Sequence, residues 1–565
     1  MKISRIAIDN YKSIKHLDFY PSEGINAFIG ANSAGKSNIF DAVNWLLGPV
    51  YPSFNSTKKE DHFLGDDNNK IKIRLEFDDG HTLELNEYLE VINYHSQLEV
   101  KSGLFFDDNT YNCKGDIREQ YCSAYLGVDR KILDYLPSNR WSLVGRILQE
   151  INRKFLQEKY THKSEEKDKK EWLKIWLQAI RDKLLFSVKD DSGQEVMKKF
   201  MTILQEESAK QLNRPMSDFI VDLSLYDPWN FYRTLQLIVK EQDMDLEFQA
   251  SNLGMGVQAS ISIAILKAYS EINLANRSPI FIDEPELYLH PQAQRNFYEI
   301  IKELSEDKRD DDGNIVREGT QIFYNTHSPN FLSTGRFHEI FLVRKNKELG
   351  TYVRYAIGEN FVNDLKIRTG IESSLSDLML HYQNAYENTG DTQKANEGFF
   401  AKKIVLVEGQ SEVLVLPLLL KLVGYDVTRE CLSIVRCGCK EELDRFFRLY
   451  TEFGIPCYLI FDGDMHLIGT EAEGSNLEKN KTIFNLFGVE NTYPDGIPTN
   501  SYLGFEDTFE TSLGFASPKK GLDLFMQIKD LVASNSYEVP SWIEQLKVKL
   551  DSLPTDNIQS ILKTV

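Results

Sequence analysis

The chain has 565 residues and a formal net charge of −20, with 42% hydrophobic and 12% aromatic residues. This hydrophobic content excludes an intrinsically disordered chain, and the length predicts two to four domains. The acidic excess excludes a protein coated in basic surface, although a local basic groove is enough to bind nucleic acid.

The apolar runs are too short to predict a membrane span. The longest, VLVLPLLLKLVG, is interrupted by Pro417 and Lys421, and the N-terminal MKISRIAIDNYKS lacks the apolar core of a signal peptide. Six cysteines without framework spacing are typical of reduced thiols. We therefore expect a cytoplasmic protein with no membrane partner.

The first predicted elements form a strand, a glycine loop and a helix in INAFIGANSAGKSNIFDAVNWLLG. INAFI predicts a buried strand, and the apolar residues after the loop recur on one helical face up to Gly48. The loop between them matches G-x-x-x-x-G-K-[ST] at Gly30, Gly35, Lys36 and Ser37. An ordinary glycine turn is the alternative, but the order of strand, loop and helix favours phosphate binding.

This loop predicts how a nucleotide is held. Its backbone N–H groups turn towards phosphate oxygens at a helix N-terminus. We expect Lys36 to reach the β- and γ-phosphates, Ser37 to hold Mg²⁺ and Asn32 to contact the nucleotide. The predicted cofactors of this site are ATP and Mg²⁺.

The segment 129–211 has a different texture. WSLVGRILQEINRKFLQEKY and KKEWLKIWLQAIRDKLL carry apolar residues at helical spacing, which predicts a helical insertion that forms a dimer contact. The run HKSEEKDKKEWLK interleaves acids and bases, as on a solvated helix face. Further on, DDDGN at 310–314 predicts a surface hairpin.

SPIFIDEPE supplies the acids that hydrolysis requires. Residues 279–282 predict an apolar strand that ends in Asp283 and Glu284. We expect Asp283 to hold Mg²⁺ and Glu284 to orient or deprotonate the attacking water. A buried strand with two acids at its solvent end is the alternative.

Two further segments complete a resemblance. SNLGMGVQASISIAILKA places Ser251, Gly254 and Gly256 before an apolar helix, and YNTHSPNF places His327 after a strand. The order of P-loop, glycine signature, DEPE, LHP and THSP resembles the ABC-type ATPase heads of SMC- and RecF-like proteins. The resemblance implies that Ser251, Gly254 and Gly256 close on ATP held by another subunit and that His327 touches the γ-phosphate. It therefore implies a homodimer or a higher homo-oligomer.

A second site is predicted from two strands near the C-terminus. IVLV is followed by Glu408 and, one helical turn later, by Glu412, while CYLIFDGDMH ends an apolar strand in Asp462 and Asp464. Parallel strands bring their carboxyl ends to one edge of a sheet, so the four carboxylates should converge. Such a cluster requires cations, and hard oxygen ligands suit Mg²⁺ or Mn²⁺, with two ions able to clamp a phosphodiester.

This C-terminal pattern resembles the Toprim domain. An ABC head followed directly by a Toprim domain resembles the OLD (overcoming lysogenization defect) family of nucleases. The resemblance implies a further acid and a late lysine in the Toprim site. FEDTFE offers Glu506, with Asp507 and Glu510 as rivals, and SPKKG offers Lys519 or Lys520 to stabilise a developing phosphate charge.

Together these patterns predict an α/β protein with an ABC-type ATPase head, a helical insertion and a Rossmann-like Toprim domain. The predicted boundaries are 1–128 and 212–370 for the head, 129–211 for the insertion, 371–400 for a linker and 401–565 for the Toprim domain. The resemblance implies a metal-dependent DNA endonuclease with a role in anti-phage defence. An ATP-gated DNA-binding scaffold with an inactive Toprim fold and a hydrolase of free nucleotides remain as alternatives.

Overall fold

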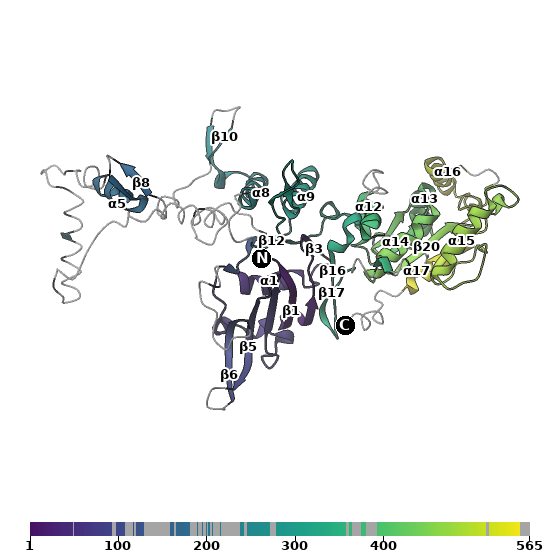
Figure 1. The fold of residues 1–565 in the computed structure, drawn as a ribbon. Coiled ribbons are helices and arrows are strands. Elements are labelled where there is room, and N and C mark those ends of the chain that lie inside the picture. The colour runs from purple at the N-terminus through teal and green to yellow at the C-terminus, as the bar shows by residue number, and fades with distance from the viewer. Residues whose placement is uncertain are drawn as a thin grey trace. The chain divides into compact units, whose positions relative to one another are not determined.

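The structure is a computed structural model. It describes residues 1–48, 50–92, 98–107, 117, 120–128, single residues and short stretches of 148–241, 246–271, 278–356, 361–363, 366, 374–379, 392–515 and 519–553. Contacts divide the chain into two compact units (Figure 1). The first unit comprises Met1–Leu126, Ser278–Glu306 and Gly319–Val565, and the second comprises Gly127–Arg277 and Asp307–Glu318.

The N-terminal part of the first unit is built on one mixed sheet of eleven strands within the described residues. Strands β16, β3, β15, β12 and β7 run parallel to one another, and β6, β5, β4, β1, β2 and β17 continue the sheet with antiparallel pairs. The strands are β1 (Ile3–Tyr11), β2 (Ile14–Phe19), β3 (Ile25–Ile29), β4 (Lys72–Phe77), β5 (Thr82–Ile92), β6 (Leu98–Phe106), β7 (Ala124–Leu126), β12 (Ile280–Asp283), β15 (Ile322–Asn325), β16 (Ile340–Asn346) and β17 (Gly350–Arg354).

Strand β3 lies between β16 and β15 in the parallel part, and all five of its residues are buried. The helix after it, α1 (Lys36–Leu47), buries the predicted face of Ile39, Phe40, Val43, Leu46 and Leu47 and ends at Gly48. The Phe28 ring lies 5.2 Å from that of Phe341 and 5.5 Å from that of Phe40. Removing such a buried ring costs about 3–5 kcal/mol of stability. This packing fixes the strand and helix that flank the glycine loop.

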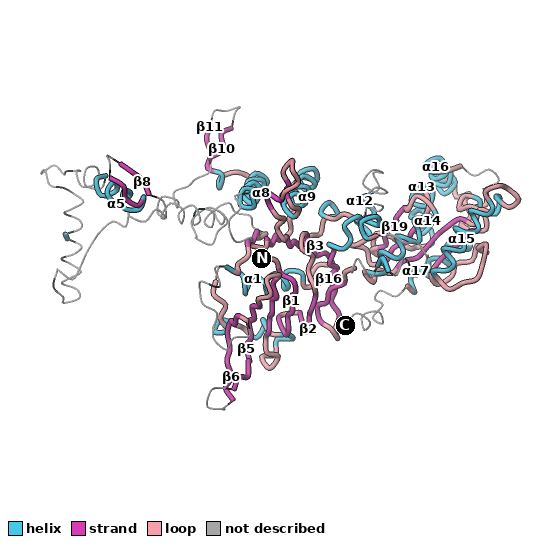
Figure 2. The backbone as a smooth tube through the Cα atoms, in the orientation of Figure 1, coloured by secondary structure: helices cyan, strands magenta, loops and turns pink. Residues whose placement is uncertain are grey.

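The C-terminal part of the first unit holds a separate parallel sheet in the order β19-β18-β20-β21. Its elements can be followed in Figure 2. The strands are β18 (Lys403–Val407), β19 (Leu432–Arg436), β20 (Cys457–Asp462) and β21 (Tyr502–Phe505), and the helices are α13 (Gln410–Leu422), α14 (Lys440–Glu452), α15 (Glu473–Leu486), α16 (Gly521–Ala533) and α17 (Ser541–Ser552). Buried residues of β18, β20, α13 and α17 form one core.

A short helix, α12 (Thr392–Gly398), ends the segment that was predicted to be a linker. The Tyr450 hydroxyl of α14 donates to the Ala395 carbonyl, and the Thr334 hydroxyl donates to the Asn396 side chain. α12 therefore makes buried hydrogen bonds both to the 3-10 turn that begins at Thr334 and to the C-terminal sheet domain.

The second unit shows one difference from the sequence prediction. The run HKSEEKDKK was expected on a helix, but β8 (Lys159–His162) and β9 (Glu165–Asp168) pair as an antiparallel hairpin before α5 (Lys169–Ile180). The helical period of buried Trp172 and Leu177 starts only after this hairpin. Most of WSLVGRILQEINRKFLQEKY lies outside the described residues.

The remaining described elements of the second unit are short, apart from one helix. They are β10 (Ile238–Glu241), β11 (Leu246–Gln249), α8 (Met255–Glu271), β13 (Lys308–Arg309) and β14 (Ile315–Arg317). The pair β13–β14 confirms the hairpin predicted around DDDGN. Among the helices described here, none has both the length and the apolar character that a membrane crossing requires.

Candidate functional sites

The phosphate loop requires its glycines for two physical reasons. Gly30 has φ +142° and Gly35 has φ +107°, conformations that side chains with a Cβ rarely adopt. A Cβ at Gly30 would lie 2.2 Å from the Val343 carbonyl oxygen, and one at Gly35 would lie 2.2 Å from Thr351 Oγ1. The loop therefore packs closely against β16 and β17 immediately before α1 begins.

Lys36 is folded back over this loop. Its side chain is 6% exposed, and Nζ donates to the carbonyls of Gly30 at 2.9 Å and Ala31 at 3.1 Å. Burial lowers the pKa of Lys36 to about 8, and the nearby Glu284 carboxylate opposes this effect. An ammonium held by neutral carbonyls at such a site gains a stronger partner when a phosphate arrives.

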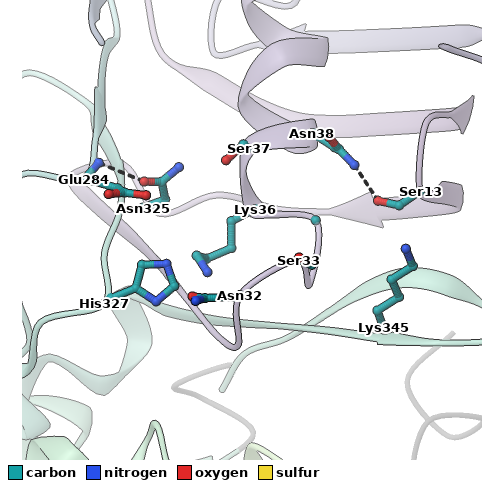
Figure 3. A pocket seen from close by; sticks show the side chains of 11 residues that line it. Ser13, Asn32, Ser33, Lys36, Ser37, Asn38, Glu284, Asn325, His327 and Lys345 are labelled. Atoms are coloured by element: carbon teal, nitrogen blue, oxygen red, sulfur yellow. Dashed lines mark hydrogen bonds between the residues drawn. The ribbon is translucent and has the colours of Figure 1, made fainter. Parts of the chain in front are cut away.

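A cavity of about 780 Å³ opens at this loop, a volume within the range of ligand pockets. Figure 3 shows Lys36 pointing between His327 and Asn32, with Glu284 on the facing segment. The structure thus brings the predicted Asn32, Ser37, Glu284 and His327 to one cavity. The lining residues are Ser13, Asn32, Ser33, Gly35, Lys36, Ser37, Asn38, Glu284, Asn325, His327 and Lys345.

Asp283 ends β12 with its carboxylate nearly buried. It is 8% exposed; Oδ2 accepts a hydrogen bond from the Tyr125 hydroxyl at 3.2 Å, and none of the described residues donates a hydrogen bond to the buried Oδ1. Burial raises the pKa of Asp283. An orphaned carboxylate oxygen beside a phosphate loop has the chemistry of a ligand for Mg²⁺, so the residues present fit this ion.

Glu284 adopts a strained backbone. Its φ is +47°, and its N–H is held by the side-chain oxygen of Asn325 at 2.9 Å. A non-glycine residue in this region costs of order 1–3 kcal/mol, so the surrounding structure must hold it there. The turn aims Glu284 into the cavity instead of continuing β12 (Figure 3).

The segment that carries His327 is fixed by a residue to which the sequence analysis gave no role. Glu286 accepts hydrogen bonds from the His327 N–H and the Thr326 hydroxyl, each at 2.7 Å. Burial and the Lys36 charge lower the pKa of His327, which favours the neutral imidazole. Glu286 is the last residue of the DEPE motif, and its place in this motif is the feature of the sequence from which a role could have been predicted.

The predicted signature lies in the second unit. Ser251 belongs to a 3-10 turn (Ala250–Asn252), Gly254 lies in the following loop, and Gly256 is already inside α8. Gln258 Nε2 donates to the carbonyls of Ser251 and Leu253, which orders the loop. The three residues are near one another at the helix start, whereas the residues of the phosphate-loop cavity belong to the first unit.

At the C-terminal sheet, Glu408 follows β18 and Asp462 is the last residue of the neighbouring parallel strand β20. Glu408 Oε1 accepts from the Asp462 N–H at 2.8 Å, and Asp462 Oδ1 accepts from the Phe509 N–H at 2.8 Å. Burial, reinforced by Glu408, raises the pKa of Asp462 to about 9, and burial raises that of Glu408 to about 7. Glu412, 4% exposed, also has its pKa raised by burial. Carboxylates with such pKa values gain most from a nearby cation.

Asp464 lies on the loop after β20 and is engaged by a lysine. Its φ is +53°, and Oδ2 accepts from Lys440 Nζ at 2.9 Å. In the part of the chain described, no three His, Cys, Asp or Glu side chains are already grouped as metal ligands. The four predicted carboxylates lie at one sheet edge, where Glu408 and Asp462 accept from backbone N–H groups and Asp464 accepts from Lys440. Their all-oxygen chemistry fits Mg²⁺ or Mn²⁺.

The three candidates for the further acid differ in the exposure and contacts of their side chains. Glu506 is exposed, and Asp507 bonds to His466. Glu510 is 7% exposed, accepts from the Ser411 hydroxyl at 2.6 Å and raises the pKa of Glu412. The Glu510 carboxylate therefore lies beside Glu412, whereas Glu506 has an exposed side chain and its carbonyl accepts from the Met465 N–H at 3.2 Å.

Both late lysines have exposed side chains. Lys520 immediately precedes Gly521, whose N–H donates to Ser411 Oγ at 2.9 Å. Its backbone therefore lies at the edge of the carboxylate cluster, while Lys519 lies one residue further away in the chain. Ser411, Lys440, Asn476 and Asn480, which surround the cluster, were missed by sequence reasoning, although Lys440 directly follows the strand β19 and its turn.

Comparison with known proteins adds two family matches. A family model described as "AAA ATPase domain" matches residues 1–119 and 85–332. A model described as "Overcoming lysogenization defect protein-like, TOPRIM domain" matches residues 399–464.

Individual relatives extend over most of the chain. The OLD nuclease of Thermus scotoductus is 27% identical over 84% of this chain and 85% of its own length. The Old nuclease of Escherichia phage P2 is 27% identical over 82% of this chain and 77% of its own length. The match to a solved Smc head domain from Pyrococcus furiosus is 14% identical and covers 65% of this chain and 99% of the solved chain, with a TM-score of 0.35.

Proposed function

Because the chain belongs to the OLD family, in which an ABC-type AAA ATPase domain is joined to a Toprim domain, we propose that it is a DNA endonuclease that hydrolyses ATP and depends on divalent metal ions. The family match confirms the α/β fold class and the ATP-binding and Toprim assignments predicted from the sequence. The metal dependence, the DNA substrate and the residue roles are our proposal.

The observation that carries the nuclease proposal is the edge shared by β18 and β20. Glu408 and Asp462 are linked there by a hydrogen bond of 2.8 Å, and both carry raised pKa values. Buried acids of this kind are typical of sites that bind a charged partner. Glu408, Glu412, Asp462 and Asp464 would hold Mg²⁺ or Mn²⁺, which when bound activates water and stabilises charge on the phosphodiester. Glu510 is our choice for the further acid, and Lys520 for the late lysine.

In the proposed ATPase site, we assign the roles of the residues from their positions at the cavity. Lys36 exchanges loop carbonyls for phosphate oxygens, and Ser37 and Asp283 would hold Mg²⁺. Glu284 orients and deprotonates water, and neutral His327 donates to the γ-phosphate. Asn325 and Glu286 position these two groups.

The test is incubation of the purified chain with supercoiled and linear DNA, with Mg²⁺ or Mn²⁺, with and without ATP. We expect nicking or linearisation that EDTA abolishes. Absence of cleavage under every condition overturns the proposal. Retention of ATP-dependent DNA binding would then favour the scaffold alternative, and release of phosphate from free nucleotides would favour the hydrolase alternative.

We also propose that the chain works as a homodimer or a higher homo-oligomer, in which Ser251, Gly254 and Gly256 complete the ATP site of a neighbouring subunit. The support is their common position at the start of α8, in a unit other than that of the cavity. Light scattering should report an oligomer with ATP and the Glu284→Gln variant. A monomer at micromolar concentration contradicts this assignment.

A role in anti-phage defence completes the proposal. It is supported by the family alone. Expression of the chain should lower the plating efficiency of phage on a sensitive host, and the Asp462→Asn variant should restore it. Equal plating with the active and inactive chains contradicts this role.

A further inference from the structure

Lys440 is a buried cation inside the proposed nuclease site. It begins α14, is 5% exposed, and donates to Asp464 Oδ2 at 2.9 Å, Asn476 Oδ1 at 2.9 Å and Asn480 Oδ1 at 3.0 Å. A lysine ammonium has three N–H donors, so all three are used. A charge is buried in this way only when it is paired and hydrogen-bonded.

The two asparagines extend this contact to the loop between Asp462 and Asp464. Asn476 and Asn480 lie one turn apart on α15, and their Nδ2 groups donate to the Gly463 carbonyl at 2.9 and 3.2 Å. Each amide therefore accepts from Lys440 with its oxygen and holds the loop with its nitrogen. Both asparagine side chains are buried, whereas the Asp464 carboxylate at the other end of the network is 24% exposed.

The loop requires such support because its backbone is crowded and strained. Asp464 has a left-handed φ of +53°, and a Cβ on Gly463 would lie 2.5 Å from the carbonyl oxygens of Phe505 and Glu506. The contact with Lys440 occupies Oδ2 of Asp464.

The charges around the loop give Lys440 a second effect. The carboxylates of Glu408, Glu412, Asp462, Asp464 and Glu510 gather at the ends of β18 and β20 and in the segments that follow β18, β20 and β21. Such a group repels itself when no cation is present. A buried ammonium on one of its members reduces this repulsion, and the same ammonium repels a divalent ion that approaches the same carboxylate.

We propose that Lys440 is a positioning residue that serves as a resident counter-cation, holding Asp464 in place and replacing part of the metal charge while the site is free of metal. The inference rests on the proposed nuclease site but makes a claim about stability and metal binding that needs no DNA. It means that the protein keeps its carboxylates assembled between metal-binding events and binds divalent ions less tightly than the bare cluster would.

The test compares thermal unfolding of the full chain in EDTA and in Mn²⁺. Lys440→Met removes the charge and keeps a buried side chain of similar length. We expect its melting temperature in EDTA to fall, and the upward shift on adding Mn²⁺ to exceed that of the wild type. Calorimetric titration with Mn²⁺ should show an affinity at least a few-fold tighter.

Asn480→Leu is the matched control, because it removes the same network's hydrogen bonds but no charge. It should lower the melting temperature in EDTA without tightening Mn²⁺ binding, so its Mn²⁺-induced shift should not exceed that of the wild type. Equal Mn²⁺ shifts in Lys440→Met and the wild type overturn the inference, since Lys440 is then only a structural donor. These measurements use no DNA, so their outcome does not depend on whether the chain cuts DNA. Failure of the inference can therefore be distinguished from failure of the proposed function.

If Lys440→Met does not fold, the milder Lys440→Gln variant is combined with Asp464→Asn. In EDTA, the double variant should be more stable than the sum of the single losses predicts, because the single changes each leave one buried charge unpaired. Additive losses overturn the inference.

Discussion

The two sites of the first unit are assembled in different ways. The ATP cavity takes its central residues from one continuous stretch, Gly30 to Ser37, whose shape is set by glycine backbone. The carboxylate cluster takes one or two residues from each of several distant segments, which only the parallel sheet brings together. A site of the first kind can be predicted from a sequence motif. A site of the second kind forms only when the fold brings distant segments together.

The two buried lysines show the same contrast. Lys36 is held by neutral carbonyls of its own loop, which a phosphate can replace. Lys440 is already paired with a carboxylate and two amides that are remote in the chain. One cation is poised for a ligand, and the other belongs to the protein's own structure.

If the two sites are chemically independent, Asp462→Asn should separate them most sharply. We expect DNA cleavage to fall at least about a hundredfold, because a charged metal ligand becomes a neutral amide. ATP hydrolysis, measured by phosphate release, should stay at the wild-type rate. The exposed acid Asp523 offers the control Asp523→Asn, which should cut normally. Wild-type nicking by Asp462→Asn would place the nuclease elsewhere.

Glu284→Gln should produce the opposite separation. Loss of the general base should lower ATP turnover about 10²–10⁴-fold, while nucleotide binding persists because Lys36, Ser37 and Asp283 are intact. Binding is measured with a fluorescent ATP analogue and turnover by phosphate release. Glu299→Gln, on the exposed surface of α9 (Pro291–Ser305), is the control. An unchanged turnover would remove Glu284 from its assigned role.

A smaller effect should distinguish the late acids of the cluster. Glu510→Gln keeps an oxygen that can accept from Ser411 but removes a buried charge next to Glu412. We expect cleavage to fall about tenfold or more, the range for residues that support metal ligands. Glu506→Gln, at an exposed position, should cut at nearly the wild-type rate. The reverse ranking would return Glu506 to the site.

The smallest predicted effect concerns stability outside both sites. Burial, with the charge of Arg336, lowers the pKa of His338 to about 4, against about 6.5 in the unfolded chain. Below pH 6.5 the unfolded chain binds more protons, so stability should be lost as the pH falls from 6.5 to 4, by about 3 kcal/mol. Urea unfolding of His338→Gln should show a shallower loss over this window. An unchanged pH slope would mean that His338 does not contribute.

The sequence could predict much of the fold because its signals are local. The strand INAFI, the helical face of Ile39 to Leu47 and the hairpin around DDDGN need only neighbouring residues, and the structure has each of them. The edge shared by Glu408 and Asp462 followed from two apolar strands and one rule of parallel sheets. The hairpin at β8 and β9 was missed because its dense charges hide a strand pattern.

The supporting residues of the sites could not be predicted in the same way. Asn325 reaches Glu284 only because β12 and β15 pair in one particular register. Glu510 is buried because the chain turns back after β21, whereas a local reading favours the acid directly after the strand. Lys440 meets Asp464 through the order β19-β18-β20 and the packing of α15, which no short motif records.

The neighbouring positions of β7 and β12 carry a consequence for engineering. Ala124 pairs with Ile280, so residues 127–277 form one excursion between adjacent parallel strands, which a crossover of about a dozen residues could span. Because each doubling of the length of a flexible loop costs only about 0.6 kcal/mol, the sheet can accommodate inserted segments of very different length between β7 and β12. Residues 127–277 could therefore be replaced by the corresponding domain of a relative without changes to β7 or β12.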